Sequence, residues 1–190
     1  MVKFTSRKLT GGLKMGNLEN IKRGCGFYVS KVHLITMILP YIKSEIEKNI
    51  GIETMLEYNL NENVNNILSN LIINKKDRKN ILNINWNSQK IQKYSNIENR
   101  LKKVIEDKNK INILISGSRK YIEEINLILN KFFNKNKVSK KEIMIINLYE
   151  VTEFDNNIRE ILDEHELILN TSGIHKIEDI FEDYKKEKIN

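Results

Sequence analysis

The chain of 190 residues has the length of about one domain, and its 40% hydrophobic and 30% charged residues are enough for one buried core. A single cysteine excludes an internal disulfide and a cysteine-cluster zinc site, and eight glycines with one proline argue against a loop-dominated scaffold. The net charge of +7 suggests nucleic-acid binding. Bulk charge is weak evidence for it, however, and part of the excess of Lys and Arg lies before the first segment with a hydrophobic period. Specific nucleic-acid binding is therefore not expected.

Residues 1–23 are predicted to form a flexible basic arm ahead of a single domain that spans 24–190. Glycines interrupt this arm and no hydrophobic period is sustained in it, and Met15 is an alternative start to Met1. No run of the sequence reaches the roughly 20 apolar residues that span a bilayer, and the basic start lacks the apolar stretch of a secretory signal. The sequence therefore predicts a cytoplasmic protein with no membrane partner.

The first half of the domain alternates predicted strands with predicted helices. The strands, marked by alternating or β-branched apolar residues, are 27–29, 52–60 and 81–86. The helices, marked by apolar residues three or four apart, are 35–50 and 61–72. Pro40 either begins the first helix or kinks it. In strand 52–60, Glu53 and Glu57 share the outer face, which predicts a half-exposed strand near a sheet edge.

The second half repeats this alternation more strongly. The predicted strands, each continuously apolar, are 111–115, 143–148 and 167–169. The predicted helices are 94–105, 122–132, 158–162 and 174–184, and Thr152 and Asp155 are spaced as a capping box before the third of these.

Strands that alternate with helices need crossover connections, which predicts a mostly parallel sheet with helices on both faces. The continuously apolar strands are expected in the centre, because strands covered on both faces lose their polar alternation. The predicted fold class is α/β: one three-layer domain with about six strands, RecA-like or Rossmann-like, without a P-loop.

Two loops are candidate ligand sites, because the carboxyl ends of parallel strands and the helix N-termini beside them favour anions. One follows strand 111–115 and the other follows strand 167–169. The candidate ligand-binding residues in them are Ser116, Gly117, Ser118, Arg119, Ser172 and Gly173. We hypothesise that the two loops line one pocket. The alternative is that Ser118 and Ser172 only cap helices.

No catalytic residue, metal site or cofactor is expected. The nucleotide signatures GxxxxGK[ST] and GxGxxG and the GxSxG elbow are missing, and the three histidines lack metal-ligand spacing. His165 is interpreted as a structural histidine at the sheet rim. Trp86 and Tyr94 either form an aromatic wall for a small apolar ligand or belong to the core.

The C-terminal third resembles the closing segment of the methanogen/methylotroph sensory (MEDS) domain. In that family a strand ends in a Tyr, a Phe follows on the next helix, and Leu-x-x-His precedes the last strand. The matching segments here are Ile146–Glu150, Phe154–Asp155 and Ile161–Ile168, and Leu162–His165 within the last of these is the Leu-x-x-His. The resemblance implies a non-catalytic sensory or regulatory module that binds an unidentified small molecule and acts with a signalling or transcription partner.

Two alternatives remain open. The segment Ile113–Arg119 is similar to the strand and loop of Rossmann-like, SLOG-type proteins, in which Gly-Ser-Arg meets a phosphate; this implies a nucleotide ligand held by 116–119 and possible turnover. A protein-interaction module is the other alternative, because the alternating strands 52–60 and 81–86 would leave a sheet edge for another chain.

Overall fold

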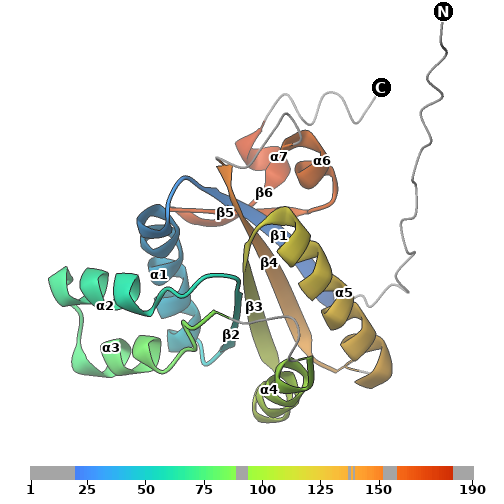
Figure 1. The fold of residues 1–190 in the computed structure, drawn as a ribbon, viewed down its shortest axis with the longest axis horizontal. Helices are drawn as coiled ribbons and strands as arrows, with labels where there is room; N and C mark the ends of the chain where they lie inside the picture. Colours follow the sequence, from blue (N-terminus) through green and yellow to red (C-terminus); the bar gives the residue numbers. More distant parts are fainter. Residues whose placement is uncertain (1–19, 89–93, 137, 139, 152–157, 182–190) are drawn as a thin grey trace, which may run out of the picture.

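The structure is a computed structural model that describes residues 20–88, 94–136, 138, 140–151 and 158–181. It is an α/β fold in which one six-stranded sheet, ordered β2-β3-β4-β1-β5-β6, is flanked by helices (Figure 1). The strands are β1 (Ile21–Tyr28), β2 (Gly51–Leu56), β3 (Lys110–Gly117), β4 (Glu142–Glu150), β5 (Leu167–Asn170) and β6 (Gly173–Lys176). The helices are α1 (Lys31–Glu47), α2 (Asn61–Asn70), α3 (Lys75–Leu82), α4 (Tyr94–Asp107), α5 (Arg119–Asn136), α6 (Ile158–Asp163) and α7 (Ile177–Ile180).

The sheet is parallel except at one edge, where β5 and β6 pair antiparallel. The three continuously apolar predicted strands are parts of β3, β4 and β5, and none of these lies at a sheet edge. This confirms the three-layer α/β prediction and the central position of the apolar strands. Among the described helices, none has the length and apolar character needed to cross a bilayer.

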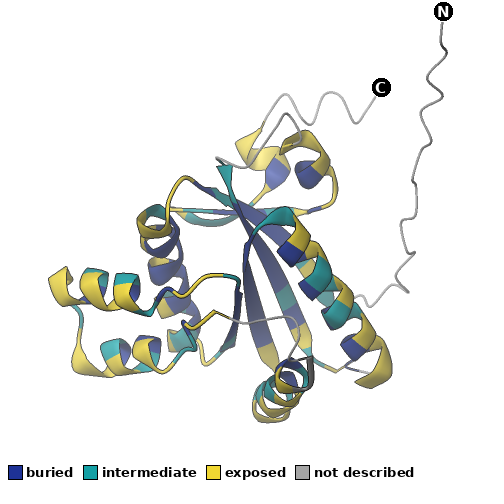
Figure 2. Ribbon diagram, viewed as in Figure 1, coloured by how far each residue is buried: buried dark blue, intermediate teal, exposed yellow. Residues whose placement is uncertain are grey.

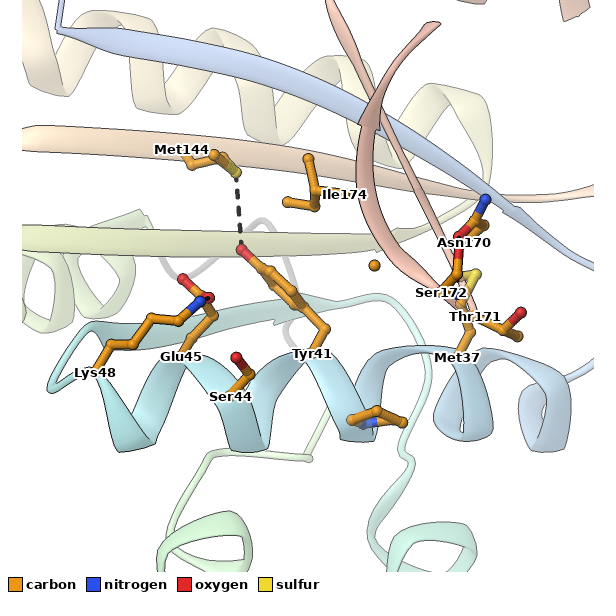
Figure 3. A pocket seen from close by; sticks show the side chains of 12 residues that line it. Met37, Tyr41, Ser44, Glu45, Lys48, Met144, Asn170, Thr171, Ser172 and Ile174 are labelled. Carbon is orange, nitrogen blue, oxygen red and sulfur yellow. Dashed lines mark hydrogen bonds and ion pairs between the residues drawn. The ribbon is translucent and has the colours of Figure 1, made fainter. Parts of the chain in front are cut away.

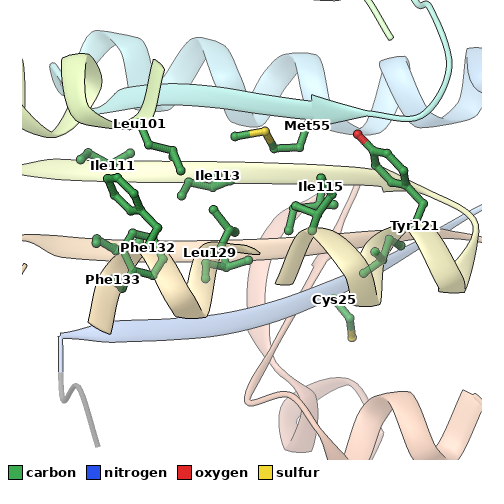
Figure 4. Packing of buried hydrophobic residues seen from close by; sticks show 14 of the residues in the cluster. Cys25, Met55, Leu101, Ile111, Ile113, Ile115, Tyr121, Leu129, Phe132 and Phe133 are labelled. Carbon is green, nitrogen blue, oxygen red and sulfur yellow. The ribbon is translucent and has the colours of Figure 1, made fainter. Parts of the chain in front are cut away.

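Two hydrophobic clusters hold the layers together, one on each face of the sheet. One unites α1, α2 and α3 with side chains such as Leu114 and Leu148. The other packs α4, α5, α6 and α7 onto the opposite face, where Ile113, Ile115 and Phe132 are almost completely buried (Figure 4). The central strands are buried along most of their length (Figure 2). Burial on both faces explains why these strands have no polar alternation.

The first strand begins earlier than the sequence predicted. Residues 21–23, assigned to the arm, are the start of β1, which pairs with β4 from Ile21 onward. Arg23 interrupts the apolar pattern but is held by the side chains of Asn126 and Asn130 on α5 (2.7 and 2.8 Å). Periodicity could not predict this part of the strand, because the polar groups that hold Arg23 lie on another element.

The predicted strand 81–86 is wrong. Asn74 caps α3 by accepting a hydrogen bond from the Asp77 backbone N–H (2.8 Å), so residues 75–82 are helical. The next residues are irregular up to Trp86, which is 1% exposed and whose Nε1–H donates to the Ile81 carbonyl (2.9 Å). The interpretation of Trp86 as a core residue is confirmed, while the side chain of Tyr94 lies outside the described residues.

Strand β2 lies at a sheet edge, as predicted, but it is not half exposed. Glu53 is buried and forms an ion pair with Arg100 on α4, and Arg100 also donates to the Thr54 carbonyl (3.2 Å). Pro40 lies inside the long helix α1 rather than at its start. The predicted arm 1–19, the capping box of Thr152 and Asp155, and Phe154 lie outside the described residues.

Candidate functional site

The loop after β3 is built as a helix start. Ser118 precedes α5, and its hydroxyl accepts a hydrogen bond from the Tyr121 backbone N–H (3.3 Å), as an N-cap does. The Ser118 backbone N–H donates to Glu57 Oε2 (2.5 Å), and its hydroxyl lies 3.2 Å from Glu57 Oε1. The position that would favour an external anion is thus occupied by the carboxylate of Glu57, which directly follows the neighbouring strand β2.

Close packing explains the glycine in this loop. A Cβ at Gly117 would lie 2.6 Å from both Cβ and Oε2 of Glu57 and 2.8 Å from Tyr121 Cδ1, so only glycine fits beside the carboxylate. Ser116 is buried, and its hydroxyl donates to or accepts from the Tyr28 hydroxyl at 3.1 Å. Three of the four candidate residues in this loop are therefore engaged in internal packing or capping.

Arg119, the fourth candidate, contacts carboxylates of two helices. Its Nε donates to Glu123 Oε1 (3.0 Å) and its Nη1 to Glu160 Oε2 (3.4 Å). Since the Arg119 side chain is 40% exposed, these are surface ion pairs. They link α5 to α6.

The loop after β5 is a hairpin turn and not the start of a helix. Gly173, at φ +117°, pairs with Asn170 and begins β6, so the prediction that Ile174 opens a helix is wrong. Ser172 caps no helix: its backbone N–H donates to Asn170 Oδ1 (2.8 Å) within the turn. A four-residue strand is too short for a period of two to be distinguished from a helical pattern.

The turn residues Ser172 and Gly173 line a groove, whereas residues 116–119 are not among those that line it. The hypothesis that the two loops share one pocket is therefore not supported by this groove. It has a volume of about 400 Å³ and runs along α1, from the β5–β6 turn to Met144 on β4 (Figure 3). We call it the α1 groove; its lining is Met37, Pro40, Tyr41, Ser44, Glu45, Lys48, Met144, Asn170, Thr171, Ser172, Gly173 and Ile174.

One end of the α1 groove carries a connected polar network. Asn112 on β3, which is buried, donates its amide hydrogens to the Tyr41 hydroxyl (2.5 Å) and to Glu45 Oε2 (2.9 Å). Lys48 Nζ donates to Glu45 Oε1 (2.7 Å), and the Tyr41 hydroxyl lies 3.7 Å from Met144 Sδ. Burial, and next the negative charge of Glu45, raise the pKa of Tyr41 far above its ordinary value, so its hydroxyl stays protonated.

This network was not predicted from the sequence, although the sequence contains a signal for it. Tyr41, Glu45 and Lys48 are four and three residues apart and so lie along one side of α1. Asn112 is a single amide within an otherwise apolar strand, and a buried amide needs hydrogen-bond partners. A polar residue inside an apolar strand therefore indicates polar groups on the helix that covers it.

The other end of the groove contains a serine next to a histidine. Ser172 Oγ lies 2.8 Å from His175 Nε2 and 2.7 Å from Asn170 Oδ1. Because Asn170 Oδ1 is an acceptor, the Ser172 hydroxyl donates its proton there and accepts from His175 Nε2–H. In this arrangement His175 cannot take a proton from Ser172, so the pair is not an activated nucleophile.

His165 is held in a neutral form on the opposite face of the sheet. Its Nδ1 lies 2.6 Å from the Ile161 carbonyl, which only accepts, so Nδ1 carries the proton. Its Nε2 then accepts from the Asn147 amide (2.9 Å). Burial lowers the pKa of His165, and the charge of Arg23 adds to this effect. The prediction of a structural, hydrogen-bonded histidine is confirmed.

Neutral His165 predicts a loss of stability in mild acid. The unfolded state binds a proton near pH 6.5 while the folded state does not, so the free energy of unfolding falls as pH drops below about 6.5, by up to about 1.4 kcal/mol per pH unit. Urea denaturation between pH 7.5 and 5 measures this slope. A His165→Gln variant should show a shallower slope, and His175→Gln, at a half-buried site in β6, is the histidine control that should keep the slope of the wild type. Equal slopes in all three would contradict the prediction.

Cys25 is fully buried in β1, and burial raises the pKa of its thiol to about 12, so it carries no thiolate at neutral pH. Within the described ranges, no group of three or more His, Cys, Asp and Glu side chains is placed to hold a metal ion. A scan against protein-family models and a search of curated proteins each found no match to this chain.

Proposed function

We propose that this chain is a non-catalytic sensory or regulatory domain that binds a small organic acid in the α1 groove. The observation that carries this proposal is the composition of the groove. Its lining includes the apolar side chains of Met37, Pro40 and Ile174. The ammonium group of Lys48 lies at one end of the groove, and the hydroxyls of the β5–β6 turn lie at the other (Figure 3). Such a site suits a ligand with an apolar body and polar ends.

Lys48 is the group expected to select an anionic end. Its side chain is 60% exposed, and its ammonium group has three hydrogens, of which one is directed to Glu45. Asn112 in turn donates to Glu45, so the Glu45 carboxylate fixes the position of the Lys48 ammonium group while it accepts only one of the three ammonium hydrogens. A ligand carboxylate would complete this arrangement.

The sensory interpretation is supported by the resemblance to the MEDS domain. The stretch Ile146–Glu150 lies in β4, the strand that also carries Met144 of the groove. The stretch Leu162–His165 precedes β5, whose turn closes the other end of the groove. These two stretches are thus directly connected in the chain to residues that line the proposed ligand site.

The SLOG-type nucleotide alternative is less well supported. A phosphate at the 116–119 loop would have to displace the Glu57 carboxylate from the Ser118 backbone N–H, and Arg119 already pairs with Glu123 and Glu160. Like charges in the same place repel each other. The loop therefore lacks the open, positive helix start that phosphate recognition requires.

A ligand panel tests the proposal. Straight-chain monocarboxylates of about four to eight carbons should raise the thermal midpoint, because a ligand that binds only the native state stabilises it by mass action. The matched alcohols and amines should have little effect. Lys48→Met should weaken carboxylate binding by about tenfold or more, as expected for loss of a charged hydrogen bond. Lys102→Met, on α4, is the matched control.

Two outcomes would reject this function. One is the absence of any shift with the carboxylates at millimolar concentration. The other is an equal shift for wild type, Lys48→Met and Lys102→Met, which would place the binding elsewhere. Release of base or phosphate from a nucleotide by the purified protein would reject the non-catalytic interpretation as well.

A further inference from the structure

We propose that copies of this chain associate head to tail, through two surfaces of opposite charge at opposite ends of the molecule. The first is a second groove between α1, α2 and α3, called here the apolar groove. The second is the acidic surface, formed by the exposed residues of α6 and α7, by Glu164 and Glu166 directly after α6, and by Phe181. The two surfaces lie on opposite faces of the sheet, since α1–α3 belong to one hydrophobic cluster and α6–α7 to the other (Figure 1).

The apolar groove is an open hydrophobic surface. It has a volume of about 340 Å³, which is room for a few large apolar side chains. Leu71 and Ile72, at its rim, are 47% and 109% exposed, and exposed apolar residues that cluster around a hollow commonly mark a protein contact. The residues that line it are Thr36, Leu39, Pro40, Lys43, Ile67, Leu68, Leu71, Ile72, Ile73 and Ile81.

Helix α3, which contributes Ile81 to the lining of the apolar groove, is basic. Helix α3 begins with Lys75, Lys76, Asp77, Arg78 and Lys79, four cations against one carboxylate. The three lysines are exposed, whereas Asp77 is buried. An apolar contact in this groove therefore has the positive charge of α3 on one side, which favours a partner whose apolar residues are flanked by carboxylates.

The acidic surface has that composition. Ile158, Ile180 and Phe181 are 40%, 41% and 38% exposed. Residues 158–181 contain six carboxylates and two cations, Arg159 and Lys176. All six carboxylates are exposed: Glu160, Asp163, Glu164, Glu166, Glu178 and Asp179. The acidic surface thus combines large exposed apolar side chains with exposed carboxylates.

The geometry determines the type of assembly. Because the two surfaces differ and lie apart on one molecule, each copy can use its acidic surface on one neighbour and its apolar groove on another, which is a heterologous contact. Each contact is small, so association should be weak, concentration-dependent and reduced by salt. It does not depend on a ligand in the α1 groove.

Sedimentation equilibrium of the full chain tests this inference. The weight-average mass should rise above the 22.4 kDa of the monomer as concentration increases, and should fall again at high ionic strength. Ile72→Asp and Phe181→Asp should each reduce self-association by about tenfold or more, since each puts a charge into an apolar contact. Leu127→Asp, at a 45% exposed site on α5, is the control that should associate like the wild type.

Mixing the two variants gives the decisive result. Ile72→Asp retains an intact acidic surface and Phe181→Asp an intact groove, so an equimolar mixture should form a one-to-one complex that stops at two chains. Circular dichroism would verify that the variants are folded. A wild type that remains monomeric up to about 1 mM, or a loss of association in only one of the two variants, would overturn the proposal.

Discussion

Replacing Trp86 with alanine should lower the free energy of unfolding by about 3–5 kcal/mol. Trp86 is 1% exposed within the cluster that joins α1, α2 and α3 to the sheet, and its Nε1–H donates to the Ile81 carbonyl. The truncation removes a large buried surface and leaves a cavity that the surrounding helices can fill only in part. Urea denaturation followed by circular dichroism measures the loss, since the chain has no other tryptophan to report by fluorescence.

Trp86→Phe is the matched control for this prediction. It keeps most of the apolar volume but removes the donor to the Ile81 carbonyl, so it should cost about 1–2 kcal/mol. Carboxylate binding in the α1 groove should be unchanged in this variant, because Trp86 does not line that groove. If Trp86→Phe lost ligand binding while it kept its stability, Trp86 would be an aromatic wall of a ligand site and not a core residue.

The second large effect is expected at the ion pair between Glu53 and Arg100. Arg100→Met should destabilise the fold by about 3 kcal/mol, because it leaves the Glu53 carboxylate, whose side chain is 8% exposed, without its cation. The same substitution removes the donor to the Thr54 carbonyl at the edge of β2. Chemical denaturation at pH 7 provides the measurement.

A double variant separates the ion pair from the general packing of β2. Glu53→Leu combined with Arg100→Met removes both charges and should recover most of the stability that the single Arg100→Met variant loses, since a buried ion pair and an apolar pair of similar volume often differ little. Additive losses in the double variant would show that the two side chains act independently. Lys102→Met, two residues along α4 from Arg100, should stay within about 0.5 kcal/mol of the wild type.

The fold class could be predicted because its signals are local. The strands within 110–117 and 142–150 are buried on both faces, and that burial makes them mostly apolar in the sequence, with Asn112 and Asn147 as buried exceptions. Residues 81–86 show the limit of this argument. Leu82, Ile84 and Trp86 alternate with polar residues as in a strand. However, Leu82 ends the capped helix α3, Ile84 and Trp86 pack beyond that end, and the cap at Asn74 outweighs the pattern.

The candidate site was harder to predict because it depends on register. Glu57 reaches the start of α5 only because Leu56 on β2 lies opposite Ser116 on β3. The hydrophobic period of a sequence does not show which residues of two strands lie opposite each other. The α1 groove similarly needs Asn112 on β3 to lie under Tyr41 and Glu45 on α1. Only the turn residues Ser172 and Gly173 were identified from the sequence, and they line a different surface from the one expected.

The position of β1 has a consequence for how the chain acquires its structure. β1 comes first in the sequence but lies in the middle of the sheet, between β4 and β5, and Ile21 pairs with Ile143. Its two neighbours must be present before its backbone groups are satisfied, and long-range pairing of this kind slows folding. During synthesis, β1 would therefore remain unpaired until its partners β4 and β5, more than 100 residues later in the chain, have been made. The sheet would form completely only after the final third of the chain has emerged.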